Sequence, residues 1–198
     1  MIYASNFLFV PRSQTANAMR ILFSALIFLT LAALSPAIAS AHPDSHEIIQ
    51  KIALEELAVT NSKLPIALKL PKTWKSQPTN ENTLIFWVPY HNGVMGHIEK
   101  RDNPMSWNDS ISLLSDFFKT KFKEDSKETF QLESGIQGEK GTISGPIGGE
   151  EYRLFVCVAQ LADNTVILYY ASAPILWFQA YEPLLNDILK SFQLPSAN

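Results

Sequence analysis

The sequence predicts an α+β domain in which helices pack on the faces of an antiparallel β-sheet. Two segments, residues 151–161 and 165–173, are apolar on both faces of an extended strand, so each face needs a cover. Turn signals such as Asn92-Gly93 separate the predicted strands, which is typical of antiparallel hairpins. Three segments with apolar residues at helical spacing supply the cover.

The first predicted helix opens the folded domain. Asp44 can cap it, with Glu47 three residues later as capping-box partner, and apolar residues recur at helical spacing to about Val59. Alternation, turn residues and β-branched or aromatic runs then predict three strands. They lie at residues 65–70, 84–90 and 94–99, separated by a turn at 71–75, a polar loop at 77–82 and a tight turn at 91–93.

A second helix begins the other half of the domain. Asn108 or Asp109 is expected to cap it, and its apolar stripe runs to Phe122 with lysines near its C-terminal end. Glycine-punctuated and apolar runs then predict four strands, at residues 129–136, 139–144, 151–161 and 165–173. A last helical stripe runs from Trp177 to Phe192.

The N-terminal segment, residues 1–41, has the pattern of a secretory signal peptide. A positive residue after Met19 precedes an uncharged apolar run over residues 21–34, and small residues follow it. The pattern favours Met19 as the start of translation, with cleavage after Ala41 or after Ala39. An uncleaved anchor is the alternative, because about 20 apolar residues can cross a bilayer.

Cleavage would leave residues 42–198 as one exported domain, periplasmic or secreted, with no membrane span. Of the 198 residues, 46% are hydrophobic and 18% are charged, so the chain can form a core. The net charge of -3 and the lack of a densely basic segment argue against nucleic acid as a partner. The single cysteine excludes an internal disulfide and multi-thiolate metal sites.

Two short motifs resemble those of the PsbP/Mog1/DcrB-like superfamily. The first is Leu-Lys-Leu-Pro-Lys-Thr-Trp-Lys over residues 68–75, and the second combines Tyr181-Glu182-Pro183 with the Ile-Leu-Lys-Ser-Phe-Gln-Leu of residues 188–194. The resemblance implies an α/β/α sandwich and a non-catalytic accessory or binding domain. It also implies packing roles, but no catalytic ones, for Pro71, Trp74, Ser191 and Phe192.

Histidines supply the candidate metal ligands, for copper or zinc. Cleavage after Ala41 would make His42 the N-terminal residue, whose amine and imidazole can chelate a metal, and cleavage after Ala39 would create donors that suit square-planar Cu(II). His46 could add a ligand. His97 and Glu99 share one strand face, with His91 across the turn. The alternative is a solvated terminus and an ordinary polar hairpin.

No motif in the sequence indicates catalysis. Cys157 lies in mid-strand, where burial should raise its thiol pKa, and Gly138 to Thr142 lacks the order of a phosphate loop. The leading hypothesis is therefore a non-enzymatic domain that binds an unknown protein or small molecule. The turn at Trp74, the hairpin at 91–97 and the glycine-rich residues 135–149 are expected to face that partner. Most aromatic rings should be core, and the candidates for partner contact are Trp74, Tyr90, Trp107 and Tyr152.

Overall fold

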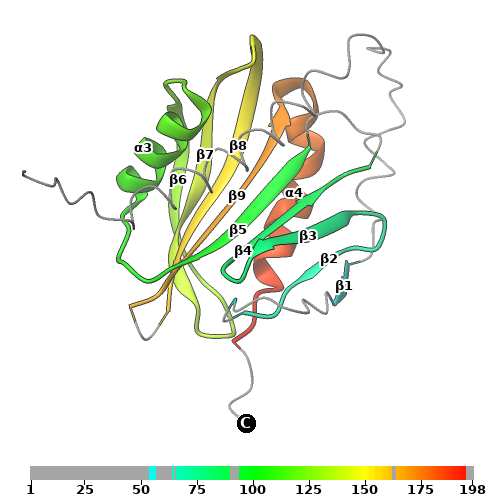
Figure 1. Cartoon of the computed structure of the whole chain (residues 1–198), viewed down its shortest axis with the longest axis vertical. Helices are drawn as coiled ribbons and strands as arrows, with labels where there is room; N and C mark the ends of the chain where they lie inside the picture. Colours follow the sequence, from blue (N-terminus) through cyan, green and yellow to red (C-terminus); the bar gives the residue numbers. More distant parts are fainter. Residues whose placement is uncertain (1–53, 57–63, 65, 90–93, 162–163, 195–198) are drawn as a thin grey trace, which may run out of the picture.

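The computed structural model describes residues 54–56, 64, 66–89, 94–161 and 164–194. Within them, a seven-stranded antiparallel sheet lies between helix α3 (Trp107–Phe118) on one face and helix α4 (Ile175–Lys190) on the other (Figure 1). The predicted α+β class is confirmed. Neither of these described helices combines the length and the apolar character needed to cross a membrane.

The sheet is built from neighbouring hairpins on each side of a central pair, β5 and β9. Its order is β3 (Lys75–Asn80), β4 (Thr83–Trp87), β5 (Met95–Arg101), β9 (Val166–Pro174), β8 (Glu150–Gln160), β7 (Gln137–Ile147) and β6 (Lys123–Gln131). A separate two-stranded ribbon joins β1 (Leu54–Glu56) to β2 (Lys69–Pro71).

The alternating side chains of β8 show why both faces need a helix. Leu154, Val156 and Val158 point to the α3 face, where they pack with residues of α3, whereas Phe155 and Cys157 point to the α4 face. Each of these side chains is at most 2% exposed. The prediction that both faces of this strand are covered is confirmed.

Two predictions in the first half of the domain are wrong. The helix predicted from Asp44 to about Val59 is wrong at residues 54–56, which form strand β1, where Glu55 pairs with Leu70, and the rest of that segment lies outside the described residues. Strand pairing here overrides the helical spacing of the apolar residues. Of the loop predicted at 77–82, only residues 81–82 form a turn, because residues 75–80 form β3, a polar edge strand whose position at the sheet edge tolerates Pro78.

The second half differs mainly in its boundaries. Ser106, not Asn108 or Asp109, caps α3, and Asp109 is its capping-box partner. The helix ends at Phe118, and its C-cap Lys119 has a left-handed φ of 54°, so Phe122 is a buried core residue outside the helix. The strand predicted at 139–144 is the longer β7, whereas the one predicted at 129–136 overlaps only the end of β6, because β6 begins at Lys123 and residues 132–136 form the turn into β7.

The two motifs behind the resemblance touch each other. The backbone N–H of Lys69 donates to Ser191 Oγ at 2.9 Å, and the Ser191 hydroxyl donates to the Ile188 carbonyl at 2.6 Å. The backbone N–H of Trp74 donates to the Pro71 carbonyl at 2.9 Å, which closes the turn. The centroid of the Trp74 ring lies 6.3 Å from that of the Tyr181 ring in α4. A β-bridge between Ala67 and Gln193 completes the junction.

Candidate functional site

The structure brings together two of the predicted metal ligands and places an arginine beside them. On β5, His97 Nε2 lies 3.7 Å from Glu99 Oε2, and Arg101 donates from its guanidinium to the same oxygen at 3.2 Å. His42, His46 and His91 lie outside the described residues. Among the residues that are described, no three His, Cys, Asp or Glu side chains gather as a metal centre.

His97 is a buried polar side chain. It is 7% exposed, and its ring stacks on that of Tyr170 with 5.0 Å between the centroids. Neither imidazole nitrogen makes a hydrogen bond, and the 3.7 Å approach to Glu99 is too long for one.

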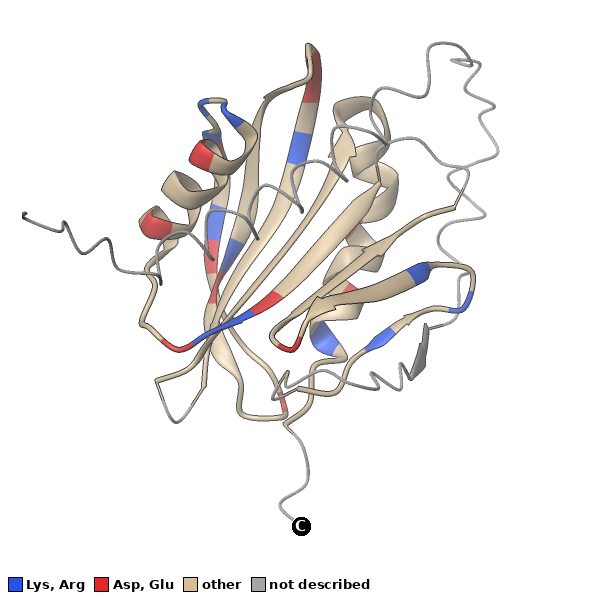
Figure 2. Cartoon of the chain, in the orientation of Figure 1, with Lys and Arg blue, Asp and Glu red and all other residues tan. Residues whose placement is uncertain are grey.

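Glu99 is the anion of this cluster. Burial raises the pKa of its carboxyl, but the neighbouring His97 and the charge of Arg101 outweigh this and lower the pKa overall. Figure 2 shows acidic and basic residues interleaved at this end of β5, where Lys100 also pairs with Asp102 at 2.9 Å. The Glu99 carboxylate is therefore already paired with the Arg101 guanidinium of the same strand.

The predicted partner-contact aromatics are divided between core and surface. Trp74 is 7% exposed and stacks with Phe86, and Trp107 is 1% exposed and donates its indole N–H to Glu124. Both rings belong to the core, so neither can offer its face to a partner. Tyr152 is half-buried, and Tyr90 lies outside the described residues.

The surroundings of Cys157 and of residues 138–142 indicate that both are parts of the sheet. Cys157 is fully buried, and burial raises the pKa of its thiol far above the ordinary range, although Lys140 acts in the opposite direction. Residues 138–142 belong to strand β7 rather than to a loop.

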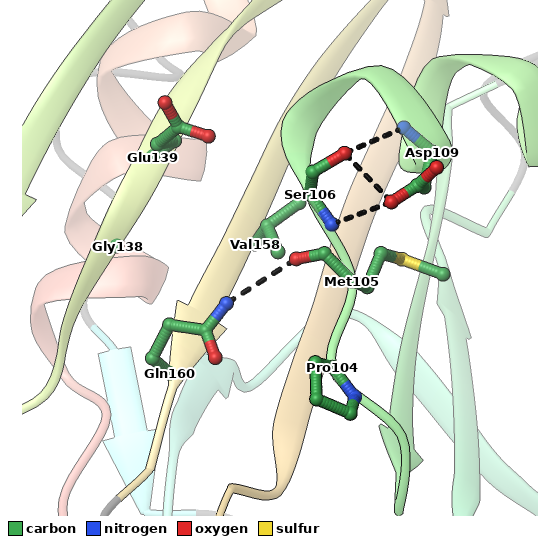
Figure 3. A pocket seen from close by; sticks show the side chains of 8 residues that line it. All are labelled: Pro104, Met105, Ser106, Asp109, Gly138, Glu139, Val158 and Gln160. Carbon is green, nitrogen blue, oxygen red and sulfur yellow. Dashed lines mark hydrogen bonds between the residues drawn. The ribbon is translucent and has the colours of Figure 1, made fainter.

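The structure also contains a groove that sequence reasoning missed. It has a volume of about 520 Å³ and lies on the α3 face, between the connection that leads into α3 and strands β7 and β8 (Figure 3). It is lined by Pro104, Met105, Ser106, Asp109, Gly138, Glu139, Val158 and Gln160. The Gln160 side chain ties the two walls together by donating to the Met105 carbonyl at 3.2 Å.

Two carboxylates define the electrostatics of this groove. Asp109 accepts from the Ser106 N–H at 2.9 Å and from its hydroxyl at 2.7 Å, and these bonds lower the pKa of Asp109. Glu139 pairs with Lys127 of β6 at 2.7 Å. The Ser106–Asp109 spacing of a capping box is visible in the sequence, but the meeting of α3 with β7 and β8 is a tertiary contact.

The arrangement of two helices around a hairpin-built sheet can be compared with known proteins. No protein-family model matches the chain, and no curated protein matches it. The solution structure of cyanobacterial PsbP (CyanoP) from Synechocystis sp. PCC 6803 matches with a TM-score of 0.55 at 10% identity, covering 82% of this chain and 99% of that one.

Two other solved structures are similar at a TM-score of 0.46. One is a crystal structure from Bacteroides thetaiotaomicron VPI-5482, at 12% identity over 67% of this chain and 46% of that chain. The other is a protein of unknown function from Pseudomonas aeruginosa, a putative regulator, at 13% identity over 74% of this chain and 99% of that chain. The likeness to CyanoP shows the fold alone: the chain has a PsbP-like α+β fold.

Proposed function

We propose that this chain is an exported accessory domain that binds a partner and has no catalytic role of its own. The observation that carries the proposal is the PsbP-like fold, which spans almost the whole of CyanoP. The secretory pattern of residues 1–41 supports the export step. The groove beside α3 supports binding, because its volume of about 520 Å³ falls in the range of known ligand sites.

Export is tested by the mass of the protein made in a bacterial host with a C-terminal tag. The expected product lies outside the cytoplasm and has lost the residues up to Ala39 or Ala41. Replacing both alanines with leucine is the matched control, since bulky side chains at these positions should block cleavage. A full-length product that stays in the cytoplasm would contradict the proposal.

A copper- or zinc-binding role is the second candidate function. It is favoured by the approach of His97 to Glu99 on one face of β5, and it is opposed by Arg101, which shares the same carboxylate oxygen. Titrating the processed protein with Cu(II) tests this role. Micromolar or tighter binding that is lost in His97→Ala would support a site on β5, loss in His42→Ala would support one at the processed N-terminus, and no binding would remove the role.

A further inference from the structure

We propose that the groove beside α3 binds an arginine or lysine side chain presented by an extended segment of a protein partner. The inference rests on the proposed binding function and adds the chemistry of the partner. Three properties of the groove carry it: the sign of its charged groups, the apolar surface between them, and the fact that each carboxylate keeps one oxygen for a new contact.

The charged side chains that line the groove are both acidic. Asp109 comes from the first turn of α3, and Glu139 comes from β7 on the other wall, with Val158 of β8 between them in Figure 3. No lysine or arginine is among the eight lining residues. A cationic group placed in the groove would therefore have a carboxylate on either side.

Each carboxylate uses one oxygen for contacts within the chain. Asp109 accepts both bonds from Ser106 through Oδ2, and Glu139 meets Lys127 through Oε1. Within the described residues, Asp109 Oδ1 and Glu139 Oε2 accept no hydrogen bond. A carboxylate can accept from several donors, so a guanidinium or ammonium group can be added without breaking the existing pairs.

The N-terminus of α3 does not turn the groove into an anion site. A helix N-terminus has about half a positive charge. Asp109 carries a full negative charge at the same position, and its lowered pKa keeps it ionised at neutral pH. An anion would therefore be repelled by Asp109, whereas the charge of Glu139 is partly balanced by Lys127.

The apolar part of the groove suits the stem of a long basic side chain. The exposed Pro104 and the half-buried Met105 supply the apolar surface of the groove, because Val158, which lies between the carboxylates, is only 2% exposed. Lysine and arginine lay their methylene stems along such surfaces while the charged head meets polar groups. The volume of about 520 Å³ also leaves room for the residues next to the basic one.

The experiment is an NMR titration of the ¹⁵N-labelled protein with two blocked tripeptides, acetyl-Ala-Arg-Ala-amide and its citrulline counterpart. Citrulline has nearly the shape of arginine but no charge. The arginine peptide should shift the amide signals of Gly138, Glu139 and Val158 and bind about three- to fivefold more tightly than the citrulline peptide. Added salt should reduce this difference.

Two variants change the groove in opposite directions. Glu139→Gln should weaken arginine-peptide binding about threefold and leave the citrulline peptide unaffected. Lys127→Gln removes the positive charge that partly balances Glu139 and should tighten arginine-peptide binding, which a damaged fold could not do. Glu150→Gln, an exposed carboxylate outside the groove, is the matched control and should change neither affinity.

Three results would overturn the inference: equal binding of the two peptides, signal shifts that map away from the groove, or spermidine binding as tightly as the arginine peptide. The last result would assign the groove to a free polyamine. None of them bears on export and processing, which the mass measurement tests separately.

Discussion

Glu99 shows how a carboxylate on a sheet can be half-buried and still charged. Alternation along β5 places it on the same face as His97 and Arg101, each two residues away. From this spacing the sequence predicts that His97 and Glu99 share one strand face, as candidate metal ligands. Arg101 follows the same rule and was missed, and it changes the chemistry because it occupies the carboxylate that a metal would need.

The lowered pKa of Glu99 predicts a contribution to stability that depends on pH. Because the folded pKa lies below its ordinary value of 4.5, the ionised carboxylate stabilises the fold above about pH 5. This contribution is lost as the pH falls through the folded pKa. Since Glu99 is partly exposed, we expect at most about 1 kcal/mol.

Urea unfolding of wild type and Glu99→Gln between pH 7 and pH 3 measures this contribution. The difference between the two unfolding free energies should be largest at neutral pH and should shrink in acid. A difference that stays constant across the series would show that the ionisation of Glu99 makes no contribution.

His97 predicts an unusual response to substitution. Its two nitrogens are buried without hydrogen bonds, which costs free energy, while its ring packs on Tyr170. His97→Phe keeps the stacked ring and removes the polar atoms, so at pH 8 it should raise the free energy of unfolding by up to about 1 kcal/mol. His97→Ala should lower it by about 2 kcal/mol. Equal losses in both variants would indicate that the nitrogens have a partner.

At the scale of elements, the segments predicted well are those whose burial leaves a pattern. β8 and β9 are buried on both faces, so their sequences are apolar at successive positions. α3 and α4 are buried along one stripe, so their apolar residues recur at helical spacing. The edge strand β3 and most of the edge strand β6 are exposed on both faces and have polar sequences that resemble loops. Their charges and Pro78 also discourage pairing with other chains.

The groove also leaves no pattern in the sequence, so it could not be predicted. Each of its walls has an ordinary local role, as a capping box on α3 and as strand positions on β7 and β8. Only the packing of α3 against the sheet places Asp109 and Glu139 in one groove. Similarly, Trp74 and Trp107 look like contact residues in sequence, and it is tertiary packing that buries them.

Gly96 predicts a steric limit in the pairing of β4 with β5. A Cβ atom at this position would lie 2.1 Å from the nearest atom of the Phe86 ring, so the ring occupies the space that a side chain would take. Gly96→Ala should lower the free energy of unfolding by about 3 kcal/mol. Adding Phe86→Leu should recover part of the loss, and thermal unfolding of both variants tests this. Additive losses in the double variant would contradict the explanation.

At the scale of the whole molecule, the central strands should open only when the whole domain unfolds. Cys157 belongs to β8, which is hydrogen-bonded on both sides and covered by a helix on each face. Its thiol should therefore react with a maleimide only as fast as global unfolding permits, with the same urea midpoint as the loss of structure. Fast labelling in native buffer would show that the α4 face opens locally. Ser112→Cys in a Cys157→Ala background, exposed on α3, is the fast-reacting control.

The bridge between Ala67 and Gln193 brings two distant parts of the chain together, so the strands and helices can be connected in a different order along the sequence. The two backbones exchange hydrogen bonds of 2.8 and 3.0 Å, so a linker of a few residues would join them into a ring. New ends fit best at Gly148-Gly149, the exposed tip of the β7–β8 hairpin, where a side chain would meet nothing within 4 Å. The resulting circular permutant would lack β1 but would keep every strand neighbour within the seven-stranded sheet, while changing which element leaves the ribosome first.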